Sequence, residues 1–215
     1  MNHLYPIFLK VHELNVLLVG GGFVATEKLE FLLKSSPLAQ VTVVSKEFRP
    51  EFLEVAEKSD TVTLIEDSYH EKYLGGKHLV IGATDNKAVN RQIRDESKER
   101  FLLVNIADTP ELCDFYLGGI VTKGNLKIAI STNGKSPTTA KRLRQLLEDV
   151  LPEEIDDLLQ NLNAYRETLK GDFEFKVKAM NEITEGLVKK EATMKKLDFR
   201  RRTLVSRFFG FVKGK

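Results

Sequence analysis

The chain has 215 residues, of which 42% are hydrophobic and 30% are charged, and its formal net charge is +2. This length allows one large or two small domains, and the near-neutral charge gives no indication of a nucleic-acid partner. The single cysteine excludes an internal disulfide and is typical of a reducing compartment. Since no run reaches the roughly 18 apolar residues of a membrane span, we expect a cytoplasmic protein without stable membrane insertion.

The first half of the chain alternates between strand and helix patterns. Continuous apolar runs typical of strands buried on both faces alternate with segments of helical periodicity. Strands are predicted at 15–19, 40–45, 61–67, 78–85 and 101–108, and helices at 23–34, 50–58 and 86–100. This alternation favours right-handed crossovers and a doubly wound parallel sheet. The sequence therefore predicts the α/β class, with a Rossmann-like domain over residues 1–111.

The pattern changes after Pro110. Residues 114–132 are typical of two strands around a turn at 123–125 (KGN), and no crossover helix separates them. A helix is expected from Pro137, where the missing N–H of proline costs nothing. Two further helical stripes follow and end in a basic, aromatic tail. We therefore predict a second segment over 112–149, with two strands and a helix, and a helical domain over 150–215.

The glycines after the first strand form the clearest local motif. Gly20, Gly22 and Ala25 fit the pattern G-x-G-x-x-G/A between a buried strand and a helix. The first glycine allows a tight turn, the second lets a pyrophosphate approach the backbone, and the small third residue lets the helix pack closely. The helix N-terminus favours an anion. The alternative is a plain glycine corner, but the flanking elements favour a dinucleotide site that includes Gly21, Phe23 and Val24.

The end of the second strand bears on the choice of dinucleotide. An acidic residue often holds the ribose hydroxyls about 20 positions after the glycines, but Ser45 occupies that position here. Ser45 could bind the ribose, Lys46 could tolerate a 2′-phosphate, and Glu47 lies just beyond. Spacing alone therefore leaves both NAD and NADP open.

Several blocks of the sequence together resemble one known family. They are PIFLKVHELNVLLVGGGFVATEKLEFLL, VTVVS, GATDNKAVN and VNIADTPELCDFYLGGIVTKGNLKIAISTNGKSPTTAKRLRQLLE, in this order within residues 4–150. The last block is the most specific, because a generic dinucleotide-binding fold has no reason to carry it. Over these residues the chain resembles the precorrin-2 dehydrogenase / sirohydrochlorin ferrochelatase family of sirohaem synthesis.

The resemblance implies an activity and an assembly. It implies NAD-dependent oxidation of precorrin-2 to sirohydrochlorin and, in some members, insertion of ferrous iron. It also implies a homodimer whose middle segment, here 112–149, exchanges strands between subunits. Two alternatives stay open: a dehydrogenase without ferrochelatase activity, and a tetrapyrrole- or nucleotide-binding protein without turnover.

The family's essential aspartate corresponds to Asp108 in the segment Asn105-Ile106-Ala107-Asp108. The position also makes chemical sense, because open α/β sheets place their ligands at the carboxyl ends of the strands. One carboxylate could act as the base in dehydrogenation and in metal insertion. The alternative is that Asp108 only shapes the turn before Thr109 and Pro110.

The remaining expectations concern the substrate and the nicotinamide. The segment 131–137 (STNGKSP) combines hydroxyls, an unusual turn, positive charge and a helix start. This combination suits the many carboxylates of a tetrapyrrole. The equally weighted alternative is a helix cap with a solvated basic face. Ala83 and Thr84 are expected on the nicotinamide side. Neither the histidines nor Cys113 show metal-ligand spacing, and Cys113 is expected to be a small core residue. The predicted substrate-binding residues are Asn105, Ser131, Thr132, Asn133, Lys135 and Ser136.

Overall fold

The computed structural model describes residues 2–185. Its internal contacts divide the chain into two units, 1–152 and 153–215, which are described separately below. The predicted basic tail lies outside the described residues. The predicted boundaries after residues 111 and 149 stay predictions. Within residues 2–185, no helix combines the length and the apolar character needed to cross a membrane.

The first unit is built on a parallel sheet. Its strands run in the order β3-β2-β1-β4-β5. This order proceeds outward from β1 first in one direction and then in the other, which confirms the predicted doubly wound, Rossmann-like class. The strands are β1 (Asn15–Val19), β2 (Gln40–Ser45), β3 (Val62–Glu66), β4 (Leu79–Gly82) and β5 (Leu103–Ile106).

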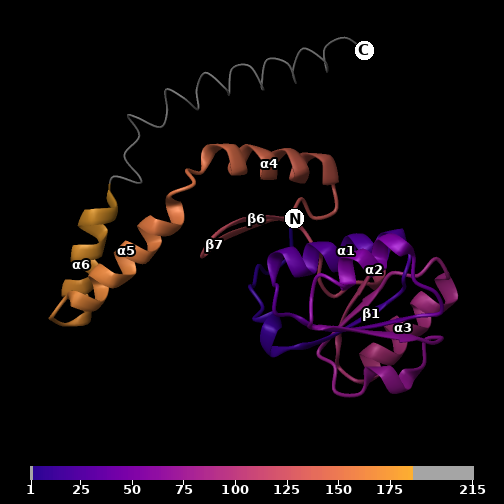
Figure 1. Ribbon diagram of the computed structural model, residues 1–215. Coiled ribbons are helices and arrows are strands. Elements are labelled where there is room, and N and C mark those ends of the chain that lie inside the picture. The colour runs from indigo at the N-terminus through magenta and orange to yellow at the C-terminus, as the bar shows by residue number, and fades with distance from the viewer. Residues whose placement is uncertain (1, 186–215) are drawn as a thin grey trace, which may run out of the picture. The chain divides into compact units, whose positions relative to one another are not determined.

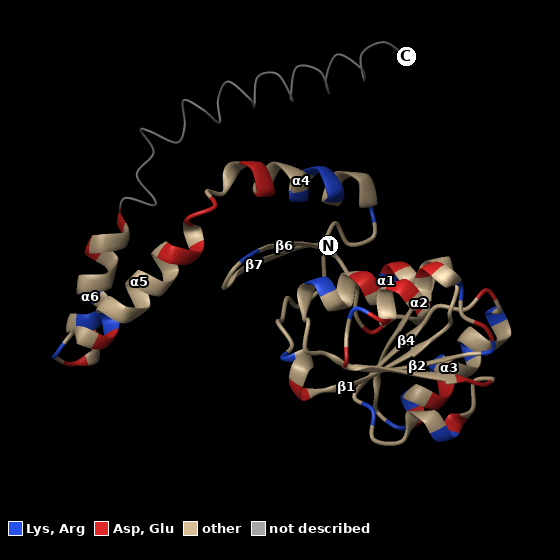
Figure 2. Ribbon diagram, viewed as in Figure 1, with Lys and Arg blue, Asp and Glu red and all other residues tan. Residues whose placement is uncertain are grey.

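Helices cover both faces of the sheet. The helices α1 (Phe23–Ser35) and α2 (Pro50–Ala56) lie on one face and α3 (Lys87–Glu99) lies on the other (Figure 1). Alternate residues of β1 serve the two cores: Leu18 packs with the α1 and α2 side, whereas Leu17 packs with the α3 side. The charged residues lie mainly on the helices and loops, and the strands are nearly free of them (Figure 2). Burial on both faces is the reason for the continuous apolar runs of the strands.

The strands β4 and β5 are shorter than predicted. The predicted range 101–108 loses both ends because Phe101 and Asp108 adopt left-handed backbone conformations, each with φ of 57°. After β4, the Asn86 side chain caps α3 by accepting hydrogen bonds from the N–H groups of Ala88 (2.9 Å) and Val89 (3.2 Å). The chain therefore turns at both sites before the extended pattern of the sequence has ended. Three short 3₁₀ helices were not predicted, namely η1 (Val11–Glu13), η2 (Glu71–Leu74) and η3 (Pro110–Leu112).

A hairpin and a helix complete the first unit. The antiparallel strands β6 (Gly119–Lys123) and β7 (Leu126–Ile130) confirm the predicted pair of strands, and α4 (Pro137–Val150) follows. Two hairpin lysines bind helix ends: Lys123 Nζ donates to the carbonyl oxygen of Leu151 at 2.7 Å, and Lys127 Nζ donates to that of Ser35. Cations are favourable at helix C-termini, so these contacts attach the hairpin to α4 and to α1.

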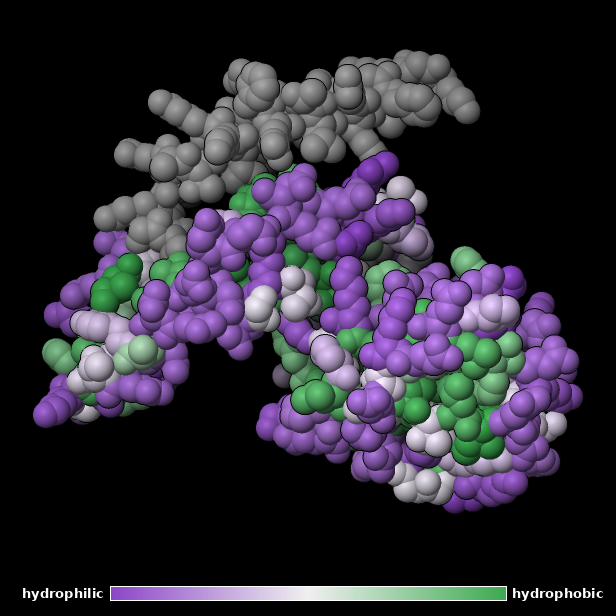
Figure 3. All heavy atoms as spheres, in the orientation of Figure 1, coloured by the Kyte–Doolittle hydropathy of each residue, from purple (hydrophilic) through white to green (hydrophobic). Residues whose placement is uncertain are grey.

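The second unit is helical, as predicted. Its described helices are α5 (Ile155–Thr168) and α6 (Phe173–Thr184), and Asp172 caps α6 by accepting the Phe175 N–H at 2.8 Å. The helices α4, α5 and α6 all carry apolar stripes. No residue of these helices is fully buried within this chain, and Phe173 is 75% exposed. Hydrophobic side chains accordingly reach the surface among hydrophilic ones (Figure 3).

Candidate functional site

The strand register collects most of the predicted site residues at one edge of the sheet. Val19 pairs with Val44 and with Gly82, and Gly82 pairs with Ile106. The residues at the ends of these four strands and just after them therefore share the carboxyl edge, which is where open α/β sheets bind ligands. They are Gly20 to Val24, Ser45 to Glu47, Ala83 and Thr84, and Asp108.

The first two glycines are required by the neighbouring backbone. Gly20 has φ of 126°, and its N–H donates to the carbonyl oxygen of Val44 at 2.9 Å. A Cβ at Gly20 would lie 2.4 Å from the Ala83 carbonyl oxygen, and one at Gly21 would lie 2.3 Å from that of Glu47. The turn is therefore closed on its inner side against any side chain.

The outer side of the same turn is open. A Cβ at Gly22 would meet nothing within 4 Å. Gly22 begins α1 without a side-chain cap, the first turn holds no acidic residue, and the Phe23 ring is 73% exposed. Asn86, Ser136 and Asp172 cap α3, α4 and α6, whereas α2 and α5 also begin without a side-chain cap. The uncapped N–H groups of α1 and the space in front of them fit the pyrophosphate of a dinucleotide.

The end of β2 supports the turn from outside the motif. The Ser45 hydroxyl donates to the Glu47 carbonyl oxygen at 2.7 Å, so only its oxygen remains free to accept a bond from a ribose hydroxyl. Lys46 and Glu47 are exposed. The N–H of Arg49 donates to the Gly21 carbonyl oxygen at 3.0 Å. The role of Arg49 could not be predicted from the sequence, since a backbone contact leaves no signal in residue type.

The end of β4 is fixed by a buried amide. Ala83 is 7% exposed, and its N–H donates to the Val19 carbonyl oxygen at 2.8 Å. The Thr84 hydroxyl donates to Asn90 Oδ1 at 2.7 Å, and Asn90 Nδ2 donates to the Thr84 carbonyl oxygen at 2.9 Å. The role of Asn90 was also not predicted. The pattern that could have indicated it is a polar residue beside Val89 and Ile93 on the inward face of α3.

The end of β5 carries the predicted catalytic aspartate. Asp108 is exposed, and its backbone adopts the left-handed conformation. Asn105, predicted to bind substrate, is instead only 6% exposed, and its Nδ2 donates to the Phe115 carbonyl oxygen at 2.7 Å. This bond engages Asn105 with its own chain.

The loop at 131–136 is organised by its own hydrogen bonds. Ser131 Oγ accepts from the Asn133 N–H at 3.1 Å, and Thr132 Oγ1 accepts from the Ser136 N–H at 3.2 Å. Ser136 Oγ caps α4 by accepting from the Thr139 N–H at 3.2 Å, which is the alternative that the sequence left open. Lys135 is exposed. The substrate-binding role of these residues stays a prediction.

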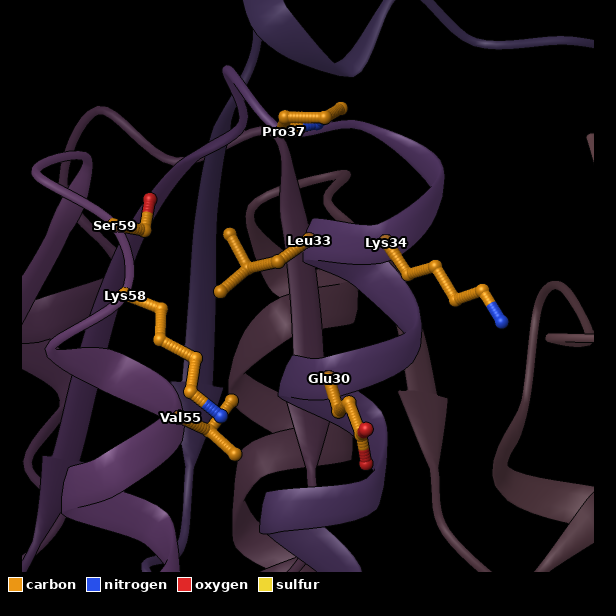
Figure 4. A pocket seen from close by; sticks show the side chains of 7 residues that line it. All are labelled: Glu30, Leu33, Lys34, Pro37, Val55, Lys58 and Ser59. Carbon is orange, nitrogen blue, oxygen red and sulfur yellow. The ribbon is translucent and has the colours of Figure 1, made fainter.

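A surface pocket of about 320 Å³ lies elsewhere. It is formed at the C-terminal end of α1 and along α2, where Leu33 points toward the segment after α2 and Lys34 turns away (Figure 4). The glycine turn is at the other end of α1, so the pocket is not part of the candidate site. Its lining residues are Glu30, Leu33, Lys34, Pro37, Val55, Lys58 and Ser59. Among residues 2–185, no group of three or more His, Cys, Asp or Glu is placed to hold a metal ion.

Two family models match the chain. One, described as "Putative NAD(P)-binding", covers residues 7–119, and the other, described as "Sirohaem biosynthesis protein central", covers residues 123–149. The chain belongs to the NAD(P)-binding family of sirohaem biosynthesis proteins. The family resemblance expected from the sequence is thereby confirmed.

Individual members of this sirohaem family show how far the similarity extends. The siroheme synthase of Citrobacter koseri is 35% identical over 80% of this chain and 37% of its own length. That of Pseudoalteromonas atlantica is 38% identical over 79% of this chain and 36% of its own length. The chain thus spans about a third of the length of these relatives. A solved structure of SirC, precorrin-2 dehydrogenase, is 27% identical, with a TM-score of 0.66 over 84% of this chain and 89% of that chain.

Proposed function

We propose that this chain oxidises precorrin-2 to sirohydrochlorin with NAD as the hydride acceptor. The observation that carries the proposal is the open, uncapped glycine turn at the sheet edge that also bears Asp108. The similarity to a precorrin-2 dehydrogenase over most of both chains supports it.

The carboxyl end of each of these four strands has a role in this proposal. The N–H groups of Gly22, Phe23 and Val24 hold the pyrophosphate, and Ser45 Oγ accepts a hydrogen bond from the ribose. Ala83 and Thr84 border the nicotinamide, which supplies the hydride acceptor when NAD is bound. The Asp108 carboxylate takes the proton that the tetrapyrrole loses as its hydride leaves. The 131–136 loop, with the exposed Lys135, binds the substrate carboxylates, and the buried Asn105 supports the strand end beside Asp108 through its bond to Phe115.

The proposal extends to iron and to assembly. The same Asp108 carboxylate would accept the pyrrole protons displaced when ferrous iron enters sirohydrochlorin as a substrate. The exposed apolar stripes of α4, α5 and α6 support a homodimer, with strand exchange in 112–149. Cys113 is a free thiol, which supports a reducing, cytoplasmic location.

The deciding experiment is an anaerobic incubation of the purified protein with precorrin-2 and either NAD or NADP. We expect the sirohydrochlorin spectrum to appear with NAD. Its absence with both cofactors would overturn the proposal. Ferrous iron is then added: sirohaem formation above the spontaneous rate identifies a ferrochelatase, and the spontaneous rate alone identifies a dehydrogenase only.

A further inference from the structure

The outer edge of the sheet beside Asp108 is closed by side chains. Within residues 2–185, β5 is the last strand on its side, so its outward N–H and C=O groups lack a strand partner. Asp114 Oδ2 accepts from the Val104 N–H at 3.1 Å, and the Asp114 N–H donates to the Val104 carbonyl oxygen at 2.8 Å. Two residues further along β5, Cys113 Sγ accepts from the Ile106 N–H at 3.3 Å. Cys113 and Asp114 therefore take the place of a sixth strand.

The thiol of Cys113 contacts both sides of the Asp108 turn. Its S–H can donate to the carbonyl oxygen of Ile106, at 3.2 Å, or to that of Thr109, at 3.3 Å. Ile106 precedes the turn and Thr109 follows it. The Cys113 side chain thus reinforces the backbone bond from the Thr109 N–H to the Ile106 carbonyl oxygen, at 3.2 Å, which joins the two segments between which Asp108 is held.

This link matters because the Asp108 backbone is strained. Asp108 has φ of 57°, and a non-glycine residue in this region persists only where its surroundings hold it. Partial burial raises the pKa of the Cys113 thiol, so the thiol keeps its proton at neutral pH and remains a donor. Asp114 is itself anchored, because its Oδ1 lies 2.9 Å from Lys98 Nζ and 3.6 Å from an Arg94 guanidinium nitrogen.

We propose that Cys113 is a positioning residue, which holds Asp108 at the carboxyl edge of the sheet by bonding the backbone on both sides of it. The effect of Cys113 on turnover rests on the proposed dehydrogenase function. Its contacts with the backbone around Asp108 do not depend on that function. Cys113 touches neither substrate nor cofactor in this role. It sets the direction of the Asp108 carboxylate.

The test compares Cys113→Ala, which removes the link, with Cys113→Ser, which keeps a donor and an acceptor. Both are measured at a temperature where circular dichroism shows them folded. Because small misplacements of a catalytic group are costly, we expect Cys113→Ala to lower kcat for precorrin-2 on the order of 10- to 100-fold. The KM for NAD should be unchanged, and Cys113→Ser should restore most of kcat.

A double-mutant cycle shows whether Cys113 acts through Asp108. In an Asp108→Ala background, Cys113→Ala should cause no further loss of the residual turnover. A Cys113→Ala variant with wild-type kcat would overturn the proposal. So would a Cys113→Ala substitution that lowers turnover by the same factor in the wild-type and the Asp108→Ala backgrounds.

Amide hydrogen exchange makes the test independent of activity. We expect the Ile106 N–H to be protected in the wild type and in Cys113→Ser and to exchange faster in Cys113→Ala. If the wild type does not oxidise precorrin-2, the proposed function has failed, and exchange alone decides whether Cys113 holds the turn. Equal protection in all three proteins would show that it does not.

Discussion

At the scale of single residues, the candidate site depends on one carboxylate and on three glycines with unequal tasks. Asp108 is exposed at the end of β5, whereas Gly20 and Gly21 are enclosed by neighbouring carbonyl oxygens and Gly22 faces open space. The sequence motif treats the glycines alike. The structure separates the two glycines that the neighbouring backbone requires from the third, which faces open space.

Asp108→Ala is expected to lower precorrin-2 oxidation to a small residual rate and to leave NAD binding intact, because the glycine turn does not depend on this side chain. The measurements are sirohydrochlorin formation and NAD titration by calorimetry. Glu111→Ala is the matched control, since Glu111 is an exposed carboxylate three residues further on. Full turnover in Asp108→Ala would remove Asp108 from the mechanism.

The glycines can be tested as a pair. Gly20→Ala forces a side chain into a positive-φ position, which costs roughly 1–3 kcal/mol of the free energy of unfolding, and also brings a Cβ against Ala83. Gly22→Ala should leave stability nearly unchanged but weaken NAD binding, because the added methyl group enters the space in front of α1. Thermal melts and NAD titrations distinguish the two. Equal NAD affinity in Gly22→Ala and wild type would argue against the pyrophosphate position.

Asp114 gives the fold a dependence on pH. Partial burial disfavours its charge, but hydrogen bonds from Lys98 and from the Val104 N–H outweigh this and lower the pKa of the carboxyl. Its stabilisation is therefore full above the ordinary Asp pKa of about 3.9 and is lost as the pH falls through the lowered value. Asp114→Asn should reduce the free energy of unfolding at pH 7 and flatten its decline in acid. Denaturant titrations from pH 7 to pH 3 measure this, and parallel curves for both proteins would contradict it.

At the scale of elements, the sequence predicted the sheet, its helices and the hairpin because apolar periodicity reflects burial directly. It overestimated β4 and β5, because the left-handed conformations of Phe101 and Asp108 and the cap at Asn86 are not visible in apolar periodicity. For the site, motifs located the strand ends and Asp108. They could not show that Asn105 and Ser136 are engaged within the chain, or that Arg49, Asn90 and Cys113 support the turns, since those roles depend on tertiary contacts.

Ser136 tests whether a cap also binds substrate. Ser136→Ala removes the cap of α4 and should cost about 1 kcal/mol of the free energy of unfolding. If the residue also holds a substrate carboxylate, the KM for precorrin-2 rises as well. Thr138→Ala, in the same exposed first turn, is the control and should change neither quantity. A Ser136→Ala protein of wild-type stability would contradict the capping role.

At the scale of the whole molecule, the parallel sheet and the three helices after the hairpin differ in how well they bury apolar surface. The Rossmann-like sheet encloses two cores, whereas α4, α5 and α6 have no fully buried residue. Exposed apolar stripes of this extent are typical of interaction surfaces. We therefore expect sedimentation equilibrium at micromolar concentration to give twice the mass of the chain, and a single-chain mass would contradict the homodimer.

The closed edge of β5 also limits what the sheet can join. An outer strand with free backbone groups is a template for pairing with foreign chains and for aggregation. Asp114 accepts a hydrogen bond from the Val104 N–H, and Cys113 accepts one from the Ile106 N–H. Both side chains come from a segment within ten residues of the strand. The protection therefore uses no residue beyond Asp114 and does not depend on the hairpin or on α4, α5 and α6. The same two side chains that border the Asp108 turn would thus also keep this edge of the sheet from pairing with foreign chains.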